Sequence, residues 1–223
     1  MVGPVPVGRE SIELFLLYLR SLSRKPLARE ALAADFGPEG DIAPQLVNLF
    51  YPVRQAHRDH PRIATFFAEW DRIFGIVYGE QLGKAQRDAP ELAALYRAVP
   101  DAELKPLFFA VHTYYALLMK FLAVEFASLQ GGALVGSFVT ALPAATERQL
   151  RHELTNLENG GTFALLGINN FLEGDFFGWY LDAWSVELAD GIRAGARTLA
   201  ERVRAEAERG AAVLLTTHDM HEA

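Results

Sequence analysis

Apolar residues recur at helical spacing through most of this 223-residue chain, and this periodicity restricts its fold more than any other feature. The pattern is clearest in Ser11–Leu22, Asp41–His57 and Pro61–Val77, where apolar side chains return every three or four residues and share one helix face. Hydrophobic residues make up 51% of the chain and charged residues 22%, the balance of a globular protein with a sizeable core. We therefore expect an all-α fold, an irregular domain of several helices.

Glycine and proline divide this pattern into separate helices. Further helices are expected between the breaks, over Asp88–Ala98, Asp101–Leu129, Thr146–Leu157 and Phe171–Arg209, the last with Gly174 and Gly178 as weak points. The small, apolar segment Ala133–Leu142 fits no element clearly. Only Ala211–Thr216, with the sequence AAVLLT, reads as a buried strand, and one strand cannot make a sheet. Residues 1–209 are expected to form a single helical domain, followed by a tail over 210–223.

Charge and composition exclude several classes of protein. The formal net charge is -7, whereas a free-standing nucleic-acid binder usually carries a basic excess. The chain has no cysteine, which excludes disulfides, thiolate metal sites and cysteine nucleophiles. Its N-terminus lacks the pattern of a signal peptide, so a cytoplasmic location is expected.

The most apolar run, Leu107–Leu129, raises the question of a membrane span. His112, Lys120 and Glu125 interrupt it, and two charges would be costly in hydrocarbon. The run therefore predicts a buried core helix and no membrane span. Within such a helix, His112 is expected to be a hydrogen-bonded core histidine.

Two motifs resemble sites but lack essential parts. Gly79–Lys84 looks like a phosphate loop, yet it has three residues between its glycines, where four are needed, and Ala85 stands where a Ser or Thr would hold magnesium. His57 and His60 could share a metal on one helix face, but Pro61 ends that helix and no third ligand is evident. We therefore expect no catalytic residue, cofactor or metal site in this chain.

Basic residues cluster in two places. The second cluster, Arg193, Arg197, Arg202 and Arg204, is mixed with glutamates and indicates a solvated helix face. The first lies across a helix junction and could touch a DNA backbone if a neighbouring domain supplied the main footprint. Its members are Arg20, Arg24, Lys25 and Arg29.

The stretch Asn169–Trp184, NNFLEGDFFGWYLDAW, is dense in aromatic residues. Placed on one continuous α-helix, its apolar arc is wider than a single packing face needs. We expect one set of side chains to be buried in the core, namely Phe177, Leu181 and Trp184. A second set is predicted to form an apolar surface that meets a partner, namely Phe176, Trp179 and Tyr180.

At these residues the chain resembles a known family. VHTYYALLMKFLAVEFASL (Val111–Leu129) followed by NFLEGDFFGWYLDAW (Asn170–Trp184) is similar to the N-terminal helical region of large adenine-specific N-6 DNA methyltransferases of restriction-modification and phage-defence systems. The likeness spans roughly Ile42–Arg204. The resemblance implies a helical accessory region that positions DNA or a catalytic domain, which would be its partner in cis or in trans. The Gly-rich cofactor loop and Asn-Pro-Pro-Tyr-type motif of that catalytic domain are not in this sequence, so no catalytic or cofactor residue carries over.

The C-terminal tail resembles a different protein family. AVLLTTHDMHEA (Ala212–Ala223) is similar to the end of an ABC-transporter ATPase core, and His218 would match its switch histidine. The phosphate loop, the acidic pair and the Ser-Gly-Gly signature of those ATPases are missing, so the resemblance implies no ATP binding. A fragment related to an ABC ATPase and a helical scaffold in an unrelated complex therefore remain as alternatives to the methyltransferase-associated domain.

Overall fold

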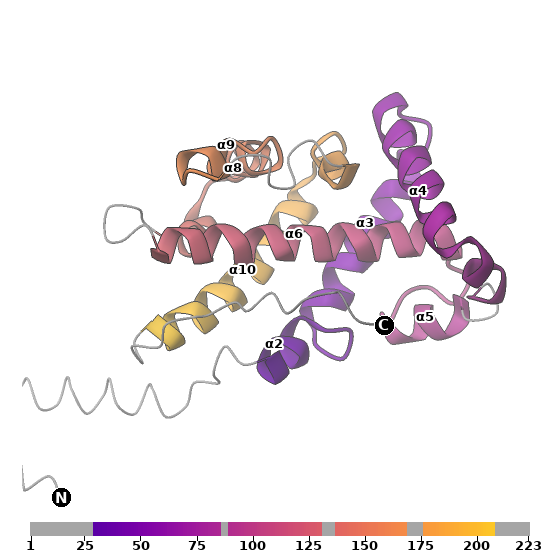
Figure 1. Ribbon diagram of the computed structural model, residues 1–223, viewed down its shortest axis with the longest axis horizontal. Coiled ribbons are helices and arrows are strands. Elements are labelled where there is room, and N and C mark those ends of the chain that lie inside the picture. The colour runs from indigo at the N-terminus through magenta and orange to yellow at the C-terminus, as the bar shows by residue number, and fades with distance from the viewer. Residues whose placement is uncertain (1–28, 86–88, 131–136, 169–175, 208–223) are drawn as a thin grey trace, which may run out of the picture.

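The computed structural model describes residues 29–85, 89–130, 137–168 and 176–207, and every element within these ranges is a helix (Figure 1). The expectation of an all-α, multi-helix domain is thus confirmed for the described chain. The expected helix at Ser11–Leu22 and the expected strand at Ala211–Thr216 lie outside the described residues.

The helices differ widely in length. The longer ones are α3 (Ile42–Ala56), α4 (Pro61–Ala85), α6 (Leu104–Gln130), α8 (Glu147–Glu158) and α10 (Val186–Ala207). Short elements connect them: α2 (Arg29–Phe36), α5 (Ala89–Leu95), α7 (Phe138–Ala141), α9 (Gly161–Leu165) and the 3₁₀ helices η1 (Leu142–Ala144) and η2 (Phe176–Leu181).

Helix α6 is the axis of the fold. It runs across the middle of the molecule and packs against α3, with α4 at one end (Figure 1), and α10 packs against α3. Its fully buried side chains include Leu107, Phe109, Tyr114, Leu117 and Val124. The prediction that Leu107–Leu129 contains a buried core helix is therefore confirmed for the described part of that run.

The charges that interrupt α6 are held by protein groups. Lys120 forms an ion pair with Glu158, and Glu125 accepts a hydrogen bond of 3.0 Å from the backbone N–H of Val139. Among the described helices, α6 is the one long and apolar enough to cross a bilayer by length and composition, and 56% of the tested stretch is buried inside the protein.

Two glycines let α10 approach α3 closely. A Cβ at Gly191 would overlap the side chain of Leu49, and a Cβ at Gly195 would lie 3.4 Å from Ile42 Cγ2. The missing side chains therefore set the separation of the two helices, and α10 buries Leu188, Ile192 and Leu199 in the shared core.

Helix boundaries follow local signals where the capping chemistry is complete. Thr146 and Gln149 form a capping box at the start of α8, so the predicted helix over Thr146–Leu157 is confirmed to within one residue. Asp41 precedes α3, but its side chain makes no capping hydrogen bond and instead pairs with Arg97 at 3.0 Å.

The expectation of one continuous helix over Phe171–Arg209 is wrong. The described part of this segment contains η2, a turn and then α10, which begins at Val186. The hydroxyl of Ser185 accepts a hydrogen bond of 3.2 Å from the N–H of Leu188 and so begins the new helix. A 3₁₀ helix advances about 120° per residue instead of about 100°, so the expected helix faces do not exist here.

Candidate functional site

The predicted split of the aromatic stretch is wrong. Trp179 and Tyr180 were expected at an exposed interface, but both have an exposed fraction of 0%. The indole Nε1–H of Trp179 donates to Thr113 Oγ1 at 2.8 Å, and its ring stacks on Phe109. Trp184, expected in the core, is only half-buried. The physical reason is the change from α-helix to 3₁₀ helix and turn, which rotates these side chains relative to the expected faces.

Phe176 is half-buried and packs edge-on against Phe177. Phe177 and Leu181 were expected inside the core. Both are half-buried and pack against the outside of the core. Of the three predicted interface residues, Phe176 alone keeps an exposed surface, and its contact with a partner stays a prediction.

A buried polar network joins η2 to α6 and α8. Lys120 Nζ donates to Glu158 Oε2 at 2.5 Å, and the hydroxyl of Tyr180 donates to Glu158 Oε1 at 2.8 Å. Gly178 passes close by, since a Cβ there would lie 3.3 Å from Glu158 Oε2. Lys120 has an exposed fraction of 0% and Glu158 of 6%, so a substrate could not reach this pair. The network therefore fixes the position of η2 against α6 and α8. Spacing along the sequence could not predict this role.

His112 makes the hydrogen bond that was predicted, but the residue is half-buried and lies beside the core. Its Nδ1 accepts a hydrogen bond of 3.0 Å from Trp70 Nε1. An indole nitrogen can only donate, so Nδ1 of His112 carries no proton. The rings of Phe74, Phe108 and Phe177 surround the imidazole, and burial lowers the pKa of His112 below its ordinary value.

The other histidine pair does not form a metal site within the described residues. His57 and His60 are exposed, and His57 Nδ1 lies 2.9 Å from the carbonyl oxygen of Val53. No group of three or more His, Asp or Glu side chains that could hold a metal occurs in the described chain. Residues Gly79–Lys84 continue α4, so their backbone forms a helix and not a phosphate loop.

The other predicted contacts cannot be placed. Arg20, Arg24, Lys25 and His218 lie outside the described residues, and Arg29 is described only as the first backbone position of α2. The proposed DNA contacts and the switch histidine therefore stay predictions.

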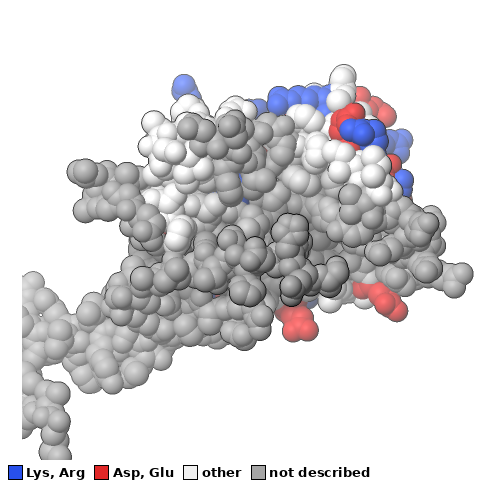
Figure 2. All heavy atoms as spheres, viewed as in Figure 1, with Lys and Arg blue, Asp and Glu red and all other residues white. Residues whose placement is uncertain are grey.

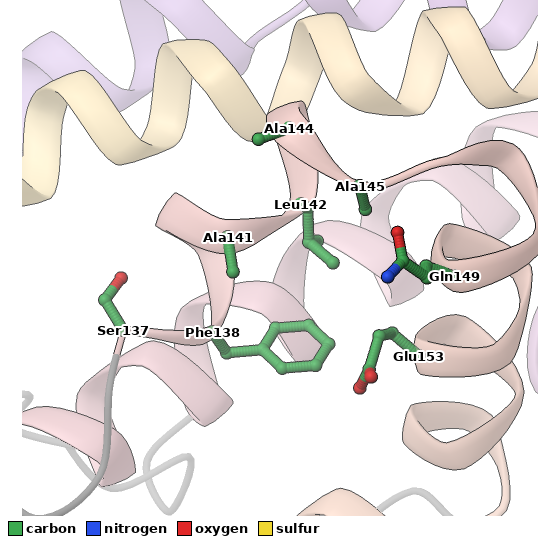
Figure 3. Close-up of a pocket in the computed structure, with 8 residues that line it drawn as sticks. All are labelled: Ser137, Phe138, Ala141, Leu142, Ala144, Ala145, Gln149 and Glu153. Atoms are coloured by element: carbon green, nitrogen blue, oxygen red, sulfur yellow. The ribbon is translucent and has the colours of Figure 1, made fainter.

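A groove between α7, η1 and α8 is a candidate binding site that the sequence did not indicate (Figure 3). Its volume is about 490 Å³. Phe138, Leu142 and small alanines form the apolar side, and Gln149 and Glu153 project from α8 on the other side (Figure 3). Residues 137–142, the described part of the segment Ala133–Leu142 that fitted no element clearly, thus supply most of one wall.

Two polar side chains of α8, Gln149 and Glu153, point into this groove (Figure 3). Gln149 Oε1 accepts from both the N–H and the hydroxyl of Thr146, so its amide nitrogen turns into the groove (Figure 3). Glu153 is half-buried and makes no hydrogen bond or ion pair with the described residues. An apolar wall beside a carboxylate suits a side chain that is apolar along its length and cationic at its tip, such as arginine or lysine.

A basic hollow lies on another face of α8. Its lining includes Arg148, Arg151, His152 and Trp184, together with Glu147, which accepts a hydrogen bond of 3.1 Å from Trp184 Nε1. The guanidinium of Arg151 also donates to the carbonyl oxygen of Leu181 at 3.0 Å, and Arg62 pairs with the next residue, Asp182, at 3.3 Å. Lys and Arg side chains gather along the upper edge of the molecule, where α8 and one end of α4 lie, with Asp and Glu among them (Figure 2).

None of the protein families, curated proteins or solved structures with which the chain was compared matches it.

Proposed function

We propose that this chain is a non-catalytic helical accessory domain that works with an adenine-specific N-6 DNA methyltransferase of a restriction or phage-defence system. In this role it holds the catalytic domain, in cis or in trans, and positions DNA for it. The proposal places the protein in the cytoplasm, where the DNA is, and assigns it no cofactor of its own.

One observation carries the proposal. The two segments that resemble the methyltransferase family, Val111–Leu129 and Asn170–Trp184, contact each other through residues 176–184, the described part of the second segment. Trp179 of the second segment donates to Thr113 of the first, and Tyr180 and Lys120 share the carboxylate of Glu158. The resembling residues are thus the contacts that specify a helical fold. A similarity concentrated in such contacts supports a shared domain and not a shared active site.

Two surfaces suit the proposed role. The groove beside Glu153 offers an apolar wall and a carboxylate to a basic side chain of the catalytic domain. The hollow beside Arg148 and Arg151 offers guanidinium groups to DNA phosphates, which Arg binds in a bidentate manner. The alternative origin in an ABC ATPase depends on residues 212–223, which lie outside the described chain.

The test is reconstitution. The chain is co-expressed with the adenine methyltransferase catalytic domain encoded nearest to it, and association is measured by size-exclusion chromatography. Transfer of the labelled methyl group from S-adenosylmethionine to unmodified genomic DNA is then measured for each protein alone and for the mixture. We expect no transfer by the chain alone and faster transfer by the mixture than by the catalytic domain alone.

Matched charge reversals locate the contact. Glu153→Arg in the groove should weaken association, whereas Glu201→Arg, the same change on the exposed face of α10, should not. Methyl transfer by the chain alone, or failure of the two proteins to associate or to stimulate transfer, would refute the accessory role.

A further inference from the structure

Helix α6 has one apolar stripe that the other described helices leave partly uncovered. Tyr115, Leu118 and Leu122 are half-buried, and Met119 has an exposed fraction of 54%. These residues are spaced by three and four, so they follow one another along a single face of the helix. The rest of α6 is packed against α3, α4, α7 and η2.

This stripe forms one side of a groove, and α2 forms the opposite side. The groove has a volume of about 680 Å³ and is lined by Leu32 and Phe36 of α2 and by the four residues of the α6 stripe. The α2 side is fixed in place, because Tyr114 donates from its hydroxyl to the carbonyl oxygen of Phe36 at 2.7 Å and Arg202 forms an ion pair with Asp35. Among the described residues of the lining, Glu39 is the one that carries a charge.

The chain itself carries a segment that fits this groove. Residues 1–28 precede α2, which begins at Arg29, one helical turn from the groove residue Leu32. Within them, Ser11–Leu22 places Ile12, Phe15, Leu16, Leu19 and Leu22 on one helical face. As a helix this segment would be about 18 Å long, compared with about 12 Å for the stripe from Tyr115 to Leu122.

The connection is also long enough. Residues 23–28 span about 20 Å when extended, which is ample for a segment that must return beside α2. A short tether of this kind gives the segment an effective concentration in the millimolar range, well above that of a second copy at ordinary protein concentrations. An apolar stripe of this extent is otherwise a binding or association surface.

We propose that Ser11–Leu22 forms an amphipathic helix that docks within the same molecule on the α6 stripe, in the groove beside α2. The groove is thereby a binding site for the chain's own N-terminal segment, and the core of the domain is completed on the side of α6 opposite to η2. This inference is independent of the proposed function, because it concerns contacts within one molecule.

Cysteine cross-linking tests the proposal cleanly, because the chain has no cysteine of its own. Met119→Cys is combined in turn with Phe15→Cys, Leu16→Cys or Leu19→Cys, and each full-length variant is oxidised with copper phenanthroline. A disulfide requires Cα atoms within about 7 Å. We expect at least one of these pairs to form an intramolecular disulfide efficiently. The matched control, Met119→Cys with Ser21→Cys on the opposite helix face, should not.

The form of the cross-link identifies the occupant. Non-reducing gels and mass spectrometry distinguish a bond within one molecule from a bond between two. Disulfides only between copies would assign the groove to a second chain and overturn the proposal. The absence of any cross-link above the level of the Ser21→Cys control would overturn it as well.

Alkylation provides a second measurement that does not depend on register. The single variant Met119→Cys should react with a maleimide at least about tenfold more slowly in the full chain than in the chain that also carries Phe15→Asp and Leu19→Asp, because a docked helix shields the thiol. Flotation with phosphatidylcholine and phosphatidylglycerol vesicles tests a lipid occupant. Equal alkylation rates, or shielding that appears only with vesicles, would refute intramolecular docking.

Discussion

The two long sides of α6 are built in different ways. On the side of η2, large side chains are fully enclosed and their polar atoms are paired: Trp179 with Thr113, and Tyr180 and Lys120 with Glu158. On the side of α2, the stripe around Met119 borders an open groove, and most of its residues are only half-buried. One face of α6 is thus fully covered by other described helices, and the opposite face borders a groove.

This difference shows which contacts select one arrangement of the helices over others. A buried hydrogen-bonded group fits one arrangement only, because any other leaves a donor or acceptor unpaired at a cost of about 1–3 kcal/mol. An apolar stripe accepts many partners of suitable shape. The η2 side therefore fixes the fold, whereas the α2 side receives the docked N-terminal segment through shape and apolar contact alone.

Substitution of Trp179 tests the difference between the two sides of α6 most directly. Trp179→Ala should lower the free energy of unfolding by about 3–5 kcal/mol, because it opens a cavity and leaves Thr113 without its donor. Met119→Ala on the other side should cost less, about 1–2 kcal/mol, because the described helices leave that side chain half-exposed and the docked N-terminal segment covers it by apolar contact, with no hydrogen bond to lose. Urea titration monitored by circular dichroism measures both, and equal losses would remove the distinction between the two sides.

The buried ion pair gives the next largest effect. Glu158→Gln keeps the shape of the side chain but leaves the ammonium of Lys120 without its countercharge, and we expect a loss of about 3 kcal/mol. The matched control is Glu153→Gln on the same helix, whose carboxylate makes no hydrogen bond or ion pair with the described residues. This control should change stability by less than about 0.5 kcal/mol. Comparable losses in both variants would show that the network adds nothing specific.

His112 makes the η2 side sensitive to acid. Burial lowers the pKa of His112 in the folded protein, so the unfolded chain takes up the proton first as the pH falls below 6.5. The free energy of unfolding should therefore decrease on acidification in this range, by at most about 1.4 kcal/mol per pH unit. His112→Gln offers Trp70 an acceptor that does not titrate. Thermal unfolding between pH 7 and 5 should show a smaller decrease for the variant, and an unchanged decrease would contradict the assignment.

Local chemistry explains how much of this fold could be predicted from the sequence. The capping box at Thr146 and Gln149, the glycines after α8 and the apolar periodicity of α3 and α6 act within a few residues, so the helices that they define were predicted correctly. The apolar setting of His112 likewise indicated a hydrogen-bonded imidazole, which the structure contains, although the residue is half-buried.

The remaining features depend on contacts that sequence spacing does not encode. Continuous helical periodicity over Phe171–Arg209 concealed the 3₁₀ turn of η2, although Ser185 was an available capping signal for a new helix. The partner of Lys120 is Glu158, on a different helix, and only tertiary packing brings them together. The groove beside Glu153 arises in the same way, from the packing of α7 and η1 against α8.

The complete enclosure of Lys120 makes its amine a chemical reporter of the folded state. Acylating reagents modify a lysine only through its uncharged, solvent-accessible nitrogen, and the Nζ of Lys120 is both ion-paired and shut away from water. Lys105, half-exposed and paired with Asp71 near the start of the same helix, meets the reagent continuously. The ratio of modification at these two positions, read from one peptide map, would therefore count how often the interior of this protein opens in a living cell.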